Sequence, residues 1–278
     1  MTYLKDISSS RELLINLTMR EVRGKYKRTL LGQLWSLANP LAAMLVYTFV
    51  FSFVFRIQPG VGEPSGLNVF ALWLLCGLLP WMFFANVLNL GTGSLVSNAG
   101  LIQKVYFFRA VLPLSLVFSS AYNWLFEMAV LVAVLAIAGS FIWPWIPLVI
   151  LLMALLAFFA AGIAMMLSVA NVYFRDTEHI LSLALQIWMY LTPIIYPISL
   201  VQDQSDRLGG LLGTPVTLME IYTLNPLERF VAVFRQVMYD NTWPNGGDFL
   251  FCVVVTVISV GLGLFVFSRN EKGLAEAL

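Results

Sequence analysis

Residues 20–55 read REVRGKYKRTLLGQLWSLANPLAAMLVYTFVFSFVF, so a basic segment runs directly into an apolar one. Seven of the chain's 16 lysines and arginines lie in its first 28 residues, whereas residues 34–55 carry no charge. A run of about 20 apolar residues can cross the roughly 30 Å hydrocarbon core of a bilayer as a helix. This stretch therefore predicts a membrane helix that follows a cytoplasmic N-terminus.

The rest of the chain has the composition of a membrane protein. Of its 278 residues, 60% are hydrophobic and 11% charged, and the mean hydropathy is +0.85. That is more apolar surface than a soluble core of this size can hide. We therefore expect an all-α integral membrane fold, a single transmembrane domain over residues 1–278. The predicted spans are 34–55, 68–90, 111–138, 146–171, 180–196 and 249–267.

Lysine and arginine residues are distributed unevenly between the segments on the two predicted sides of the membrane. Six spans place both termini in the cytoplasm, and twelve of the 16 cations then lie there. Residues 1–33 predict a cytoplasmic amphipathic helix at the interface, the alternative being a solvated basic tail. Residues 197–247 predict an external segment whose apolar stretches are too short to cross. The protein is thus expected to be multi-pass, in the cytoplasmic membrane of a bacterium.

Two cytoplasmic connections have unusual patterns. Apolar residues of segment 101–109 recur at helical spacing with polar ones between them, which predicts a short helix beneath the membrane. Segment 171–178, NVYFRDTE, mixes aromatic and charged residues, a composition that suits docking into a protein groove. Each segment alone would also fit an ordinary membrane-edge anchor.

No catalytic, metal-binding or cofactor-binding pattern is present. The Walker A motif requires Gly-Lys-Ser/Thr after an earlier glycine, and the nearest approach, residues 24–26 (Gly-Lys-Tyr), fails on both flanks. His179 is the only histidine, and Cys76 and Cys252 lack paired spacing, which excludes His-pair zinc motifs and gives no redox signal. Nothing in the charge distribution indicates nucleic-acid binding. Energy for uphill transport must come from a gradient or a partner.

Two polar residues interrupt the third predicted span. Asn123 and Glu127 lie one helical turn apart on the same face. A charged group in mid-membrane costs about 2.5 to 3.5 kcal/mol even on lenient scales, so such residues need a reason to be there. The sequence leaves two readings open, a hydrogen-bonded contact between helices or a role in transport.

The chain resembles the type-two ABC transporter permeases that export lipid-linked polysaccharides such as O-antigen, teichoic acid and galactan. The order and spacing of five stretches across the six spans carry this resemblance. They are 20–40 (REVRGKYKRTLLGQLWSLANP), 101–113 (LIQKVYFFRAVLP), 171–176 (NVYFRD), 186–197 (QIWMYLTPIIYP) and 225–235 (NPLERFVAVFR).

The resemblance implies a half-transporter. A second copy of the chain would complete the membrane pathway, and two copies of a separate ATPase, which bind ATP and Mg, would dock beneath it. The resemblance assigns coupling to the ATPase to Asn98, Leu101, Gln103, Lys104, Tyr106, Arg109, Asn171, Tyr173, Arg175, Asp176 and Glu178. It also implies external gate helices carrying Asn225, Pro226, Phe230 and Phe234, although a folded external loop without a gating role remains the alternative.

Aromatic residues are the candidates for contact with a glycan, because the CH-rich faces of sugars stack on aromatic rings. They are Tyr47, Phe51, Trp73, Trp81, Trp188, Tyr190 and Tyr196. The alternative for each is an interfacial anchor or a lipid-facing ring.

Three functions compete at this point. The first is the permease subunit of an ATP-driven exporter of lipid-linked polysaccharide, surrounded by membrane lipid. The second is an efflux permease for drugs or small lipids. The third is a membrane glycosyltransferase, which would need paired carboxylates and a metal. The sequence has only Asp203 and Asp206 as candidates for such a pair, and both lie on the predicted outer face.

Overall fold

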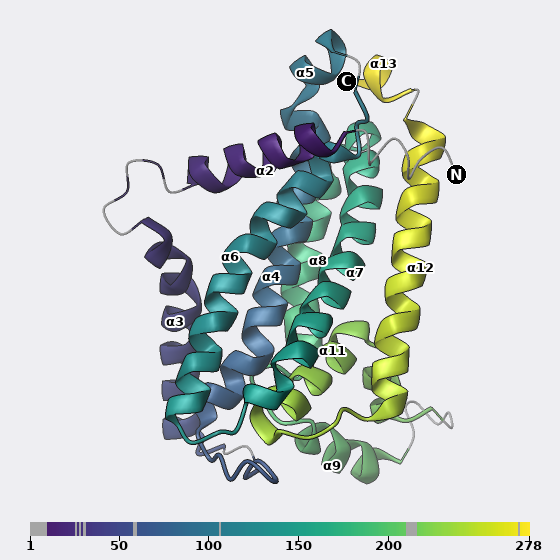
Figure 1. Ribbon diagram of the computed structural model, residues 1–278. Helices are drawn as coiled ribbons and strands as arrows, with labels where there is room; N and C mark the ends of the chain where they lie inside the picture. The colour runs from purple at the N-terminus through teal and green to yellow at the C-terminus, as the bar shows by residue number, and fades with distance from the viewer. Residues whose placement is uncertain are drawn as a thin grey trace.

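Figure 1 shows the computed structural model of the chain, which describes residues 10–25, 27, 29, 32–57, 60–105, 107–209, 216–271 and 273–278. Every regular element in these ranges is a helix. Five helical segments are long and apolar enough to cross a membrane. They are Gly32–Val54, Phe70–Ser97, Val111–Ile137, Trp143–Tyr173 and Gly246–Asn270. The all-helical membrane fold is confirmed, and these segments correspond to five of the six predicted spans.

The bundle is built around α4 (Phe70–Ser97), with α6 (Val111–Ile137) and α7 (Ile146–Tyr173) packed against it and α12 (Gly246–Asn270) packed against α7 (Figure 1). In the most apolar window of α4, 78% of the residues are buried. The first span, α3 (Trp35–Tyr47) with its continuation η2 (Thr48–Val54), is 6% buried by the same measure. A helix that is apolar all round faces protein or lipid. Thus α4 forms the core, and α3 stands at the edge with its apolar surface uncovered.

The remaining predicted span, 180–196, is fifth in chain order and is a shorter helix in the structure. α8 covers Thr177–Leu191, 15 residues, which is about 22 Å of helix against a hydrocarbon core of roughly 30 Å. Thr192 has an extended backbone (φ −107°, ψ 128°), the conformation favoured before a proline such as Pro193. The proline therefore ends the helix before the position that hydropathy predicted.

The two ends of the bundle carry different elements (Figure 1). At one end α2 (Arg11–Lys25) crosses the bundle near α5 (Ala99–Lys104) and α13 (Leu274–Ala277). At the other end lie α9 (Ser199–Leu208), α10 (Leu218–Thr223), α11 (Pro226–Arg235) and η5 (Gln236–Asp240). The predicted N-terminal helix is present in α2, and its Leu17 is buried in a cluster with Leu95 of α4 and Val111 of α6. α2 thus packs on the bundle.

α7 and α12 approach each other through glycine. A Cβ atom added at Gly162 would lie 2.4 Å from the backbone of Ser259, and one added at Gly263 would lie 2.5 Å from the carbonyl oxygen of Gly162. Ser259 donates a hydrogen bond from Oγ to the Phe159 carbonyl at 2.8 Å across the same contact. Small residues let helices pack closely in lipid, where association relies on van der Waals contact and interhelical hydrogen bonds.

Two side chains hold the chain together where α8 ends. Arg235 of α11 is buried, and its guanidinium donates to the carbonyl oxygens of Pro193 and Ile194, each at 2.6 Å. Asn225 caps α11 by accepting from the backbone N–H of Leu227 at 3.0 Å. The same Asn225 oxygen also accepts from Trp188 Nε1 of α8 at 2.8 Å. α8 and α11 are therefore fastened to each other.

Replacing Gly162 by alanine tests the α7–α12 contact. Gly162→Ala should lower the midpoint of thermal unfolding in detergent by several degrees, because its Cβ meets backbone that cannot move away cheaply. Gly261→Ala on α12 is the control, since a Cβ there has no atom within 4 Å. That control should be neutral or stabilising, as alanine is the better helix former. Equal midpoints for the two variants would contradict the close approach.

Replacing Asn225 by alanine tests the junction of α8 and α11. Loss of an N-cap costs about 1 kcal/mol, and leaving the half-buried Trp188 indole without its acceptor adds up to about 1 kcal/mol. Asn245→Ala is the matched control, because Asn245 caps α12 through the Gly247 N–H in the same way. Denaturation in detergent should show the larger loss for Asn225→Ala, and equal losses would mean that the Trp188 bond contributes nothing.

Candidate functional site

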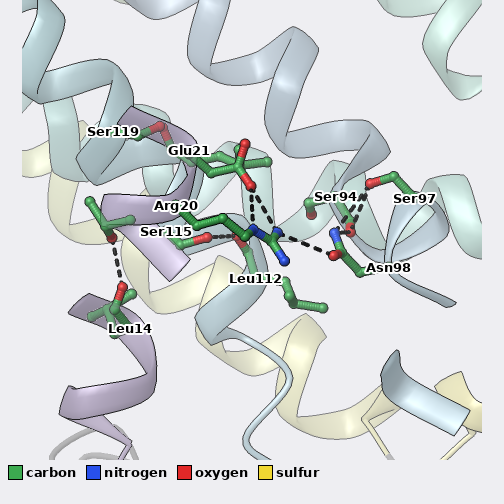
Figure 2. Close-up of polar contacts among 11 residues, drawn as sticks. Leu14, Arg20, Glu21, Ser94, Ser97, Asn98, Leu112, Ser115 and Ser119 are labelled. Carbon is green, nitrogen blue, oxygen red and sulfur yellow. Dashed lines mark hydrogen bonds and ion pairs between the residues drawn. The ribbon is translucent and has the colours of Figure 1, made fainter. Parts of the chain in front are cut away.

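The predicted coupling residues gather at the α5 end of the bundle. Figure 2 shows Arg20 of α2 between Glu21, with which it forms an ion pair at 2.8 Å, and Asn98, whose Oδ1 it reaches at 3.5 Å. Asn98 in turn donates to the Ser94 carbonyl at 2.9 Å. α2 is thereby tied to the α4–α5 junction. The N-terminal helix and the first predicted coupling segment form one continuous surface.

The residues of that coupling segment differ in exposure. Gln103 and Lys104 are exposed on α5, whereas Leu101 and Arg109 are half-buried. Tyr106 lies outside the described residues. The exposed residues offer polar contacts to a partner, and Leu101 packs against a buried cluster that includes Ile102.

The second coupling segment separates into an inner and an outer part. Asn171 is buried, and its amide donates to the Thr92 carbonyl at 3.2 Å and to Glu178 Oε1 at 2.8 Å. These bonds fasten the α7–α8 turn onto α4, so Asn171 and Glu178 position the turn. The outer part consists of exposed residues: Tyr173, Phe174, Arg175 and Asp176.

Phe174 is a residue that the sequence analysis missed. Its side chain is 72% exposed at the tip of the α7–α8 turn. A large aromatic ring held outward beside charged residues is typical of the buried centre of a protein interface. The signal was present in the motif 171–176, but the sequence alone could not say which of its two aromatic rings points furthest out.

The C-terminus belongs to the same end of the molecule. The guanidinium of Arg109 contacts the backbone carbonyl of Glu271, and the Arg109 N–H donates to Glu271 Oε1 at 3.4 Å. α13 follows directly and packs beside α5 and α7. Arg109 thus joins the first coupling segment to the chain end, a contact that nothing in the sequence pattern indicated.

The predicted glycan-contacting aromatics fall into two groups. Trp73 and Trp81 are buried within the chain. The Trp73 ring lies under Arg235, 3.5 Å from its guanidinium carbon, and Trp81 lies edge-on to Trp188 with centroids 6.3 Å apart. As placed here, Trp73 and Trp81 pack helix against helix. Their predicted contact with a glycan stays a prediction.

The second aromatic group lies nearer the surface. Tyr190 is 56% exposed on α8, and Tyr196 donates from its hydroxyl to the Tyr190 carbonyl at 2.7 Å. Tyr47 and Phe51 are half-buried on the first span, with ring centroids 6.4 Å apart. These four rings are half-buried or exposed, and their predicted contact with a glycan stays a prediction.

The predicted gate residues anchor α11 inside the bundle. Phe230 and Phe234 are fully buried. Phe230 packs against Phe159 of α7 with centroids 5.6 Å apart, and Phe234 meets Trp124 of α6 at 6.0 Å. Pro226 occupies the first turn of α11, directly after the capping Asn225. α11 is held by apolar packing as well as by its cap.

Charges around α11 are also paired within the chain. Arg229 forms an ion pair with Asp248 at the start of α12 and lies 3.6 Å from Glu228. Burial raises the pKa of Asp240, the last residue of η5, to about 6, and the nearby Arg235 counteracts this rise. The segment from α11 to α12 is therefore fixed by electrostatics at several points.

The intramembrane polar pair opens onto a cavity. Asn123 and Glu127 line a space of about 550 Å³ between α2, α3, α4 and α6. Asn123 donates to the Ser119 carbonyl of its own helix at 3.0 Å. The pair therefore faces a cavity, and the hydrogen bond of the Asn123 amide stays within its own helix. This arrangement favours a binding or transport role over a contact between helices.

Comparison with known proteins agrees with this architecture. Residues 12–205, from α2 into α9, match the family described as ABC-2 type transporter. The chain is 30% identical over 272 residues to the O-antigen export system permease protein RfbA of Klebsiella pneumoniae, covering 96% of this chain and 95% of that protein. It is 28% identical over 280 residues to RfbA of Myxococcus xanthus, with 99% and 98% covered.

A more distant relative matches over a similar length. Identity to the polysialic acid transport protein KpsM of Escherichia coli is 22% over 268 residues, which covers 93% of each chain. The family match includes the first four candidate spans and both predicted coupling segments, and the likenesses extend over nearly the whole chain. The chain therefore belongs to the ABC-2 type transporter family, as a multi-pass membrane subunit related to polysaccharide export permeases.

Proposed function

We propose that this chain is the permease subunit of an ABC exporter that moves a lipid-linked cell-envelope polysaccharide, of the O-antigen or capsule type, out across the cytoplasmic membrane of a bacterium. The observation that supports it most is the likeness over 96% or more of the chain to proteins named as O-antigen export permeases. Family membership makes the chain a transport subunit, so the glycosyltransferase alternative is set aside.

The topology proposed for the protein has six crossings. α8 with residues 192–197 makes the sixth, although the helix itself is short. The support is that α2 and α13 lie at the same end of the bundle (Figure 1), because an even number of crossings returns a chain to its starting side. The basic α2 end is then cytoplasmic, as the distribution of lysine and arginine favours.

The partners proposed are a second copy of the chain and two copies of an ATPase that binds ATP and Mg. The first span supports the partnership with a second copy, since it exposes Leu45 of α3 and Phe49 of η2 while contributing little to the core. The outward Phe174, Arg175 and Asp176 support the partnership with the ATPase. ATP-driven closure beneath the membrane would press on this turn, and Asn171 would pass the movement to α4.

Depletion of the chain in its host tests the substrate. Polyprenyl-linked glycan should accumulate at the cytoplasmic face, measured as glycan that a lectin reaches in inside-out vesicles but not on intact cells. The purified chain without its ATPase should hydrolyse no ATP. An unchanged sidedness of the glycan pool together with lost export of hydrophobic drugs would favour the efflux alternative.

Phe174→Ala tests the docking surface. Truncating an exposed aromatic at the centre of an interface should lower ATPase co-purification and glycan export several-fold, with the melting temperature unchanged. Phe141→Ala is the matched control, because Phe141 is 70% exposed just before α7, at the opposite end of the bundle. If Phe141→Ala loses the ATPase and Phe174→Ala keeps it, the proposed sidedness is wrong.

Arg175 and Asp176 complete the test of this turn. Either alanine variant should leave ATP hydrolysis in the assembled complex while glycan export falls, because both charged side chains are exposed at the turn. Normal export by both variants would remove them from the coupling surface.

A further inference from the structure

The cavity beside Glu127 has a polar wall inside the membrane region. It lies between the end of α2, the start of α3, and the middle of α4 and α6, with a volume of about 550 Å³. Its polar side chains are Lys25, Thr29, Ser36, Asn39, Asn86, Ser120, Asn123 and Glu127. Asn86 and Asn123 sit near the middle of helices of 28 and 27 residues. Polar groups at this depth are expensive and commonly functional.

Several atoms of this wall lack a hydrogen-bond partner. Ser36 Oγ, Asn123 Oδ1 and Trp124 Nε1 are buried and unbonded among the described residues. Asn123 is 5% exposed and Trp124 2%. The carboxylate of Glu127 lies within electrostatic reach of Lys25, which lines the same cavity. Since buried polar atoms in native proteins are nearly always bonded, this concentration points to a guest that would supply the missing bonds.

The chemistry of the wall selects the guest. Amides and hydroxyls both donate and accept, and a carboxylate accepts, so the wall can bond the hydroxyls of a sugar in both directions. Phe83 and Trp124 are stacked, with centroids 4.1 Å apart, and supply an aromatic surface in the same wall. A purely apolar guest would leave the polar atoms unbonded, and a bare anion would face Glu127. No group of three His, Cys, Asp or Glu side chains that could hold a metal occurs in the described ranges.

The cavity also has a basic mouth and a membrane side. Lys25 lines it at the α2 end, where a phosphate would meet an ammonium group. A second space of about 370 Å³ shares Lys25, Asn86 and Asn123 with the first, so there is room for more than one polar group. α3, which bounds the cavity, exposes apolar residues including Leu41 and Leu45. An apolar tail can therefore lie along α3 in lipid.

We propose that this cavity binds the sugar headgroup of a membrane amphiphile, with the hydroxyls on Asn86, Asn123 and Glu127 and a linking phosphate toward Lys25. This site deepens the proposed function and rests on it for the source of the sugar, the first residue attached to the lipid carrier. A membrane glycolipid would present the same headgroup chemistry, and the experiment separates these two sources.

Binding is measured by native mass spectrometry on the full chain in nanodiscs of phosphatidylethanolamine and phosphatidylglycerol. The probes are undecaprenyl phosphate carrying one glucose, undecaprenyl phosphate alone, and monoglucosyl diacylglycerol. The variants are Asn86→Ala and Glu127→Gln. Asn89→Ala is the matched control, because Asn89 is an exposed residue of α4 and is absent from the cavity wall.

The glucosylated probe should bind more tightly than the bare phosphate. Each cavity variant should weaken it about ten-fold, the effect of losing one strong hydrogen bond, while Asn89→Ala and the melting temperatures stay unchanged. Equal binding of monoglucosyl diacylglycerol would assign the site to sugar headgroups in general, and its failure to bind would assign the site to the lipid carrier's sugar. Both results support the proposal.

Two results would overturn the proposal: equal binding of undecaprenyl phosphate with and without glucose, or unchanged binding by both cavity variants. The proposed function fails separately. If the depletion experiment shows glycan export but the cavity variants bind normally, only the cavity proposal is lost. If the cavity binds sugar but depletion leaves the glycan pool unchanged, only the export assignment is lost.

Discussion

The guanidinium of Arg235 supplies the hydrogen bonds that the backbone lacks where α8 stops. A carbonyl in a bilayer has no water to bond, so irregular backbone survives there only when protein satisfies it. Arg235 donates to the carbonyls of Pro193 and Ile194, and the ring of Trp73 lies against the cation. Such a contact stabilises a desolvated cation. Hydrogen bonds from Arg235 therefore tie α11 to the end of α8, while α11 itself packs on α4 and α12 and α8 packs on α4.

Hydropathy predicted five of the spans well because it measures the free energy of moving side chains from water into lipid. In an unbroken helix the backbone bonds to itself, so the side chains decide whether the segment inserts. Hydropathy failed after Leu191 for the same reason. Residues 192–196 remain mostly apolar, yet Pro193 ends the helix, and the bonds that compensate come from an arginine more than 40 residues later in the chain. Composition likewise could not distinguish Trp73, buried under a cation, from an aromatic ring facing a pathway.

The functional residues divide in a similar way. A helical period placed Asn123 and Glu127 on one face, and both line one cavity. The helical period could not predict that Asn86 and Ser36 line the same cavity, because the period of one helix does not say which other helices face that helix. In the α7–α8 turn, the motif predicted a docking segment, but only the structure shows Asn171 bonded inward to Thr92 while Phe174 points out. The sequence thus grouped residues on shared faces and segments better than it assigned the contacts of each one.

Trp124 belongs both to the wall of the cavity beside Glu127 and to the packing around α11. Its ring stacks on Phe83 in the cavity wall and meets Phe234 of α11 edge-on, with centroids 6.0 Å apart. Protein interiors are packed densely enough that such a ring cannot shift without displacing its neighbours. The fit of this one indole therefore constrains the cavity wall and the seat of α11 together, so a change in the shape of either requires the other to repack.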